Sequence, residues 1–254
     1  MKFSGKRILI TGASRGLGYV AAQAFAKEGA KLLLVARDAR RLNDLHALLH
    51  NPDQHYHMSM DLTDECMAES LVECAREMFG GIDIILHCMG GGFGHRDPLL
   101  SWEQFETLHR SNIGVAAELN RLLIPGMIER GWGRVIHVGS TASGEACGSV
   151  GYNTCKAALA AYVRSLGNAL AGQGVVVTGV NPGAFYAPEN AMHRFEQRNP
   201  EVFCEWVERR LPRGYVGKAE EILPLLFLLA SDEASMMAGS CVAIDAGESV
   251  AYAG

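Results

Sequence analysis

The chain has 254 residues, of which 48% are hydrophobic and 20% charged, so it can bury a substantial core. Its formal net charge of −5 argues against nucleic acid or an anionic membrane as a main partner, because both require a concentrated basic surface. The N-terminal apolar run is too short for a secretory signal, and the longest late run, residues 222–230, is too short to span a bilayer. We therefore expect a soluble cytoplasmic protein without nucleic-acid or membrane partners.

The cysteines and histidines form no recognisable disulfide or metal-binding pattern. The seven cysteines are scattered, odd in number and contain no Cys-x-x-Cys pair, which favours reduced thiols. His55 and His57 are two residues apart, a spacing that on a strand only puts both rings on one face. We expect no metal site.

The first predicted strand, residues 7–10, is followed by Thr-Gly-Ala-Ser-Arg-Gly-Leu-Gly at positions 11–18 and then by a helical pattern. Gly12 permits a sharp turn, Gly16 lets backbone N–H groups approach a pyrophosphate, and Gly18 leaves room for helix to pack on strand. The free N–H groups and dipole at the helix start favour an anion. The stretch predicts a dinucleotide site; a plain turn between core elements is the alternative. The candidate cofactor-binding residues here are Gly12, Ser14, Arg15, Gly16, Leu17 and Gly18.

The second predicted strand, residues 32–36, ends where dinucleotide folds that prefer NAD carry an acidic residue. Ala36 takes that place, Arg37 follows, and Arg15 stands in the glycine turn. Two guanidinium groups suit a 2′-phosphate in charge and geometry, so we predict NADP(H) as the favoured cofactor. NAD(H) remains possible because Asp38 places a carboxylate next door, and two solvated surface arginines are the alternative explanation.

The rest of the chain alternates between strand and helix patterns. This alternation predicts an α/β fold: one Rossmann-type, doubly wound parallel sheet of about seven strands with helices on both faces. The further expected strands are residues 54–60, 82–86, 134–138, 175–180 and 240–245, and the expected helices are residues 39–49, 64–79, 101–128, 151–170 and 219–230.

The reactive residues are predicted at the end of one strand and on the helix that follows. Tyr152 and Lys156 are four residues apart, so a helix brings both onto one face. Ser140 lies twelve residues before the tyrosine, at the end of the preceding strand. Tyr-x-x-x-Lys alone is common by chance. Combined with the glycine turn, Asn112 and Ser140 in this order, it resembles the classical short-chain dehydrogenase/reductase family over nearly the whole chain, and 3-oxoacyl-[acyl-carrier-protein] reductase-like members in particular.

The resemblance implies hydride transfer between a nicotinamide cofactor and a carbonyl or alcohol. We expect Tyr152 to act as the general acid or base and Ser140 to orient the carbonyl oxygen. Lys156 is expected to lower the pKa of the phenol by roughly 2 to 3 units and to hold the nicotinamide ribose. In the family an asparagine at the position of Asn112 bends its helix and holds a water near the lysine.

The resemblance assigns further cofactor contacts at the ends of later strands. Asp61, followed by Leu62, is expected beside the adenine; the alternative role of Asp61 is a cap for the helix 64–79. Gly90 is expected to allow close approach of backbone to cofactor, and Tyr152 and Lys156 to contact the cofactor as well. The expected contacts near the nicotinamide are Pro182, Gly183 and Phe185.

Two stretches depart from the family pattern. His87-Cys88-Met89 stands where Asn-Asn-Ala is usual, and His87 is a candidate to replace the asparagine hydrogen bonds that steady the sheet. Ala187 replaces a threonine that commonly binds the nicotinamide carboxamide. These departures raise the alternative of an NADP(H)-binding sensor module without chemistry, against which the intact Ser140, Tyr152 and Lys156 argue.

We therefore predict an enzyme, a reversible NADP(H)-dependent carbonyl reductase or alcohol dehydrogenase acting on a small molecule. The substrate stays open between a 3-oxoacyl thioester, a sugar or polyol, and other ketones, since a fold does not choose among them. Residues 1–254 are expected to form one domain, with residues 184–213 as a substrate-binding lid insertion. A homo-oligomer, a dimer or tetramer paired through two long helices, is also expected.

Overall fold

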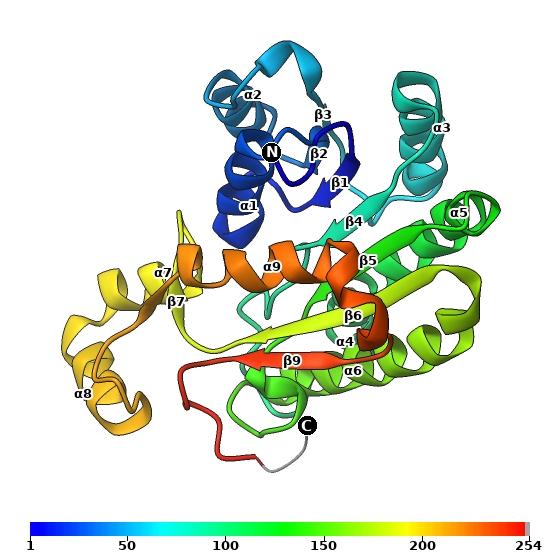
Figure 1. Cartoon of the computed structure of the whole chain (residues 1–254). Helices are drawn as coiled ribbons and strands as arrows, with labels where there is room; N and C mark the ends of the chain where they lie inside the picture. The colour runs from blue at the N-terminus through cyan, green and yellow to red at the C-terminus, as the bar shows by residue number, and fades with distance from the viewer. Residues whose placement is uncertain (252–254) are drawn as a thin grey trace.

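A computed structural model describes residues 1–251; the last three residues of the predicted domain lie outside that range. Seven parallel strands form the central sheet in the order β3-β2-β1-β4-β5-β6-β9 (Figure 1), which confirms the doubly wound sheet predicted from the sequence. The strands are β1 (Arg7–Thr11), β2 (Lys31–Ala36), β3 (Tyr56–Ser59), β4 (Ile84–His87), β5 (Gly133–Val138), β6 (Val175–Pro182) and β9 (Cys241–Ile244).

Helices cover both faces of the sheet because alternate strand residues point to opposite sides. Ile8 and Leu32 belong to one core cluster, with α1, α2 and α9, whereas Leu9 and Leu33 belong to the other, with α3, α5 and α6. The strands are apolar at successive positions because both faces are buried. The helices are α1 (Gly16–Lys27), α2 (Ala39–Ala47), α3 (Met67–Phe79), α4 (Trp102–His109), α5 (Val115–Glu129), α6 (Val150–Leu170), α7 (Ala191–Arg198), α8 (Pro200–Arg210) and α9 (Leu223–Leu229).

The carboxyl ends of the parallel strands share one edge of the sheet. The chain order reverses at this edge between β1 and β4, since β2 and β3 extend the sheet on one side of β1 and the later strands on the other. Open α/β sheets bind ligands at such a switch point. Thr11 and His87, which end β1 and β4, are register partners there, so the loops that follow these strands lie together.

Three predicted helices differ from their sequence boundaries. The helix expected at 64–79 begins only at Met67 because Cys66 has left-handed backbone (φ 63°), and Asp61 does not cap it. The helix expected at 101–128 is divided by one π-helical turn, Arg110–Gly114, between α4 and α5. The last expected helix, 219–230, is a 3-10 turn (Ala219–Glu221) followed by the short α9.

Residues 184–213, named here the lid segment, carry α7 and α8 beyond the carboxyl edge of the sheet (Figure 1). At its base, β7 (Phe185–Tyr186) pairs with β8 (Gly217–Lys218). The apolar side chains of this region form a separate small cluster, which contains Tyr186, Met192, Phe195, Phe203, Trp206, Val207, Leu211 and Val216. The segment therefore has its own packing and is attached to the sheet mainly at its two ends. Within residues 1–251, none of the helices combines the length and apolarity that crossing a membrane requires.

Candidate active site

Ser140 and Tyr152 come together at the carboxyl edge of the sheet. Ser140 follows β5, and its Oγ accepts a 3.2 Å hydrogen bond from the Ala142 amide, while Tyr152 lies in the first turn of α6. The Ser140 hydroxyl is close enough to the phenol to act toward lowering its pKa, but burial outweighs it and raises the pKa of Tyr152 above its ordinary value. The pairing of hydroxyl and phenol predicted from the sequence is present in the fold.

Lys156 lies one turn further along α6 and is buried, with 4% of its surface exposed. Its Nζ donates a 2.9 Å hydrogen bond to the Val138 carbonyl and lies 5.6 Å from the centre of the Tyr152 ring. Burial lowers the pKa of Lys156 to about 8. In the cofactor-free protein the net pKa of Tyr152 is raised and not lowered as expected. Burial dominates at the phenol, and the ammonium group is directed to a backbone carbonyl.

Asn112 lies in the π-helical turn and joins the helix to the loop after β4. Its Oδ1 accepts a hydrogen bond from the Gly91 amide at 3.0 Å, and its Nδ2 donates to the Gly91 and Leu108 carbonyls at 3.0 and 2.9 Å. Both N–H groups of the Asn112 side chain thus donate to backbone carbonyls. A water held by Asn112 would therefore have to donate to its Oδ1 or to its backbone carbonyl.

Gly90 lies where Asn112 and Lys156 approach each other. Its φ is +144°, and a Cβ added to it would lie 2.6 Å from Asn112 Oδ1 and 3.7 Å from Lys156 Nζ. A side chain at position 90 therefore collides with Asn112 and reaches van der Waals contact with Lys156. The neighbour that excludes a side chain here is Asn112; the expected approach to a cofactor stays a prediction.

The three glycines of the first turn have different surroundings. A Cβ at Gly12 would lie 3.0 Å from the backbone of Cys88 and Met89, and one at Gly18 would lie 2.6 Å from the Gly12 carbonyl. Gly16 has a φ of +62°, and a Cβ there would meet no atom within 4 Å. Gly12 and Gly18 are thus required by chain packing, whereas Gly16 borders open space.

Some donors of the first turn are used within the protein. The Gly16 amide, expected at a pyrophosphate, donates a 2.8 Å hydrogen bond to the carbonyl of Pro188 in the lid segment. The side chain of Leu17 is buried in the core, so any cofactor contact of this residue falls to its backbone. Ser14 is partly exposed and Arg15 exposed beside them.

Two residues predicted at the adenosine end lie side by side after β2 and β3. Arg37 Nη1 lies 3.3 Å from Asp61 Oδ2, and the Arg37 side chain is 64% exposed. The second oxygen of Asp61 accepts hydrogen bonds from the Thr63 amide and hydroxyl at 3.0 and 2.7 Å. Asp61 therefore shapes its own loop. Leu62 is buried in the core.

The end of β6 is held against β9 and the turn that follows it. Pro182 is the register partner of Ile244, and the Gly183 amide donates to the Ile244 carbonyl at 3.2 Å. Phe185 lies in β7 and packs against the core. Ala187, the position of the missing threonine, is also buried in that core, with 9% exposed.

His87 has the hydrogen-bonding role suggested for it. Its Nε2 lies 3.0 Å from Asn120 Oδ1, and Asn120 Nδ2 lies 3.3 Å from His137 Nε2 and donates to the Tyr162 hydroxyl at 3.1 Å. The two imidazoles stack with centroids 4.6 Å apart. Burial lowers the pKa of His87 to about 4, so the ring is neutral at physiological pH. The substitution thus keeps a buried polar link between the sheet, α5 and α6.

Each histidine of the 55/57 pair makes hydrogen bonds within the protein. His55 Nδ1 accepts from the Leu32 amide at 3.2 Å, and His57 Nε2 lies 2.7 Å from Asn43 Oδ1. Residues 1–251 contain no group of three His, Cys, Asp or Glu side chains placed to hold a metal ion. A surface groove of about 590 Å³ between residues 62–69 and α4 and α5 is lined by several carboxylates, but not by Ser140, Tyr152 or Lys156.

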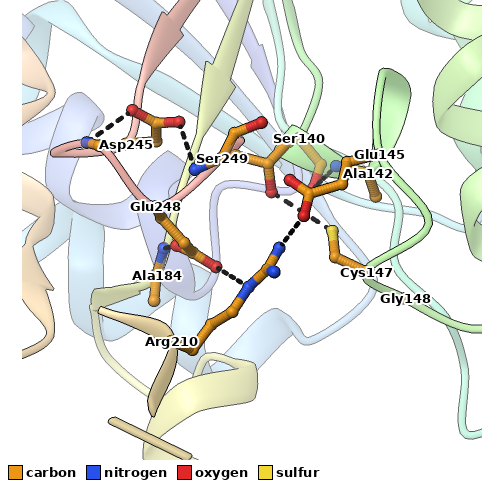
Figure 2. Close-up of polar contacts among 12 residues, drawn as sticks. Ser140, Ala142, Glu145, Cys147, Gly148, Ala184, Arg210, Asp245, Glu248 and Ser249 are labelled. Atoms are coloured by element: carbon orange, nitrogen blue, oxygen red, sulfur yellow. Dashed lines mark hydrogen bonds and ion pairs between the residues drawn. The ribbon is translucent and has the colours of Figure 1, made fainter. Parts of the chain in front are cut away.

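Sequence reasoning missed Glu145, Arg210 and Glu248, which lie around the loop that follows Ser140 (Figure 2). Glu145 and Arg210 form an ion pair, and Arg210 Nε lies 4.0 Å from Glu248 Oε1. These residues are far apart in the sequence, and no local motif marks them.

The chain was compared with protein families and with known proteins. Residues 12–249 match the family model described as enoyl-(acyl carrier protein) reductase. Levodione reductase from Leifsonia aquatica is 31% identical over 260 residues, covering 99% of this chain and 97% of that protein. The 3-oxoacyl-[acyl-carrier-protein] reductase of Salmonella typhimurium is 29% identical over 252 residues, covering 97% and 98%. A crystal structure of levodione reductase superposes with a TM-score of 0.89 at 28% identity, covering 98% of this chain and 100% of that one. The chain therefore belongs to the short-chain dehydrogenase/reductase family of oxidoreductases, which act on CH–OH and carbonyl groups.

Proposed function

We propose that this protein is an NADP(H)-dependent reductase that converts a ketone to a secondary alcohol, and catalyses the reverse reaction when the alcohol is supplied. The observation that carries the proposal is the gathering of Ser140, Tyr152 and Lys156 at the sheet edge beside the glycine turn. A hydroxyl and a phenol directed at one place suit an oxygen atom that gains negative charge during reduction.

The residues around the glycine turn and Gly90 are suited to binding a dinucleotide. Gly16 borders open space at the start of α1, and Gly90 admits no side chain beside Asn112 and Lys156. The nicotinamide, when bound, supplies or accepts the hydride. Lys156 would hold the ribose next to it, and Arg15 and Arg37 would bind the 2′-phosphate of NADP(H). The absence of an acidic residue at the end of β2, where Ala36 stands, supports NADP(H) over NAD(H).

In this reaction Tyr152 donates its proton to the substrate oxygen, and Ser140 donates a hydrogen bond that holds this oxygen in place. Lys156, with a pKa of about 8, is predominantly charged at neutral pH. A charge beside the phenol would favour the phenolate left after proton transfer. Exchange of the spent proton passes through the region between Lys156 and Asn112, whose side chains approach each other at Gly90.

The proposed substrate class rests on the names of two relatives and on the apolar side chains of the lid segment. One relative is named for 3-oxoacyl thioesters and another for levodione, and both names describe ketone reduction. The family model is described instead by enoyl reduction; the paired Ser140 and Tyr152 favour a carbonyl oxygen. The apolar cluster of the lid segment supports a ketone with a hydrophobic side over a sugar or polyol, which needs many polar partners.

The test is NADPH oxidation with a panel of 3-oxoacyl thioesters, cyclic diketones, ketoses and enoyl thioesters, in wild type and Tyr152→Phe. Turnover of a ketone should fall by about 10²- to 10⁴-fold in the variant, in keeping with loss of general acid catalysis. Near-normal turnover in Tyr152→Phe would eliminate the proposed acid. Binding of NADPH without turnover of any compound would favour the sensor module.

We also propose a homo-oligomer paired through α5 and α6, because short-chain dehydrogenases resembling this chain associate in this way. The outer surface of α6 carries small side chains, including Ala157 and Ala161. Light scattering of the purified protein measures the oligomeric state, and a monomer would overturn the proposal. The seven cysteines are all free, which supports a cytoplasmic location.

A further inference from the structure

The two ends of the lid segment meet at one buried carboxylate. Glu248, with 7% of its surface exposed, accepts a 2.6 Å hydrogen bond at Oε2 from the amide of Ala184, the first residue of the segment. Its other oxygen lies 4.0 Å from Nε of Arg210, the last residue of α8. Figure 2 shows the carboxylate of Glu248 between these two groups. The same side chain therefore contacts the lid where it leaves the sheet and where its second helix ends.

The chain around Glu248 is shaped to present it. Asp245, just after β9, accepts hydrogen bonds from the Gly247 and Ser249 amides, each at 3.0 Å, and its carbonyl accepts one from the Glu248 amide at 3.0 Å. Gly183 makes the approach possible, because a Cβ at that position would lie 2.5 Å from Glu248 Oε2. The glycine predicted to contact a cofactor thus has a clear structural role toward Glu248.

Arg210 carries the connection onward to the loop that follows Ser140. Its Nη2 donates a hydrogen bond to Glu145 Oε1, and the hydrogen bond with Arg210 lowers the pKa of Glu145 below its usual value. Glu145 lies between Ser140 and Tyr152 in the sequence. The contacts form one continuous path from Ala184 through Glu248 and Arg210 to the loop between two candidate catalytic residues.

We propose that Glu248 is a positioning residue that fixes the lid segment at both ends and, through Arg210, aligns the loop carrying Ser140. The proposal rests on the proposed function for its kinetic consequence, but the lid contacts themselves do not depend on it. Glu248 touches neither Ser140 nor Tyr152, so its loss should loosen substrate binding more than it slows the chemical step. A hydrogen bond to a charged group is strong enough for an effect of about tenfold.

The experiment compares Glu248→Ala and Glu248→Gln with the matched control Glu208→Gln, an exposed glutamate on α8. Hydrogen exchange of the Ala184 amide reports the contact directly, without any substrate. We expect exchange at Ala184 to accelerate about tenfold or more in Glu248→Ala, and less in Glu248→Gln because the amide oxygen still accepts. The control should exchange like wild type.

Kinetics on the ketone identified by the panel form the second readout. KM should rise about tenfold in Glu248→Ala while kcat changes less than about threefold, and Glu248→Gln should lie between this variant and wild type. Arg210→Met should reproduce the rise in KM, whereas Arg209→Met, on an exposed neighbour, should not.

The outcomes separate this proposal from the proposed function. Faster exchange at Ala184 in an enzyme without ketone turnover would support the lid contact and overturn the reductase assignment. Unchanged exchange and an unchanged KM in a folded Glu248→Ala would overturn the positioning role, whatever the substrate. If Glu248→Ala fails to fold, Glu248→Gln and Arg210→Met still decide between these results.

Discussion

The amide of Gly16 donates a 2.8 Å hydrogen bond to the carbonyl of Pro188. This contact joins the start of α1 to the lid segment at the place where the glycine turn borders open space. A pyrophosphate bound at this turn would approach the same amide. Cofactor binding and the position of the lid are therefore expected to influence each other.

Gly16→Ala should mainly weaken cofactor binding, whereas Gly18→Ala should mainly reduce the stability of the fold. Gly16→Ala places a Cβ in open space, so its cost is the left-handed backbone, about 1 to 2 kcal/mol, while the Cβ obstructs the cofactor. Gly18→Ala places a Cβ 2.6 Å from the Gly12 carbonyl, so chain packing suffers. We expect Gly16→Ala to raise the Kd for NADPH at least about tenfold, and Gly18→Ala to lose more unfolding free energy. Fluorescence titration and urea unfolding measure the two effects; tight NADPH binding by Gly16→Ala would place the pyrophosphate elsewhere.

Gly90→Ala should disable the site beyond its effect on stability. Its Cβ would lie 2.6 Å from Asn112 Oδ1, whereas a Cβ at Gly91, which also has a positive φ (+138°), would meet nothing within 4 Å. Gly91→Ala is therefore a control that shares the backbone strain, on the order of 1 to 3 kcal/mol, without the collision. We expect kcat/KM to fall at least about tenfold further in Gly90→Ala than in Gly91→Ala, because Asn112 must move. Equal activities would show that this approach is not needed for turnover.

Arg37→Ala should reduce the preference for NADP(H). The guanidinium is 64% exposed and paired with Asp61 at 3.3 Å, so its removal should change stability by less than about 1 kcal/mol. Loss of a charged donor to the 2′-phosphate should raise the Kd for NADPH about tenfold and leave the Kd for NADH nearly constant. Arg40→Ala, which removes a 91% exposed arginine nearby on α2, is the control. A constant ratio of the two affinities in Arg37→Ala would remove this residue from the cofactor site.

The sequence predicted the local parts of this molecule well. The apolar strands, the glycine turn and the spacing of Tyr152 and Lys156 depend on neighbours within one or two turns, and their geometry follows from helix and strand periodicity. The pairing of Ser140 with Tyr152 was predicted from the family resemblance. The loop between these two residues has no regular pattern that would by itself predict that their side chains lie close together.

The remaining features depend on contacts between distant segments. Glu248 meets Ala184 across 64 residues of chain, and nothing near either residue marks the contact. The predicted direction of the shift in the Tyr152 pKa was also wrong. Burial raises this pKa, and the burial arises only from the assembled fold. The late start of α3 depends on the left-handed Cys66, which residue type does not predict because non-glycine residues rarely adopt this conformation.

Lys156 should make the stability of the protein depend on pH in a defined direction. Its pKa is about 8 in the folded, cofactor-free protein, against roughly 10.4 in an unfolded chain. Between these values the unfolded state binds more protons, so the unfolding free energy of wild type rises with pH. In Lys156→Met this contribution is absent. We expect wild type to gain about 2 kcal/mol relative to Lys156→Met between pH 7.5 and 9.5, measured by urea unfolding of both proteins at each pH. Parallel pH dependences would mean that the ammonium is as well solvated in the fold as in water, and that its charge costs nothing beside Tyr152.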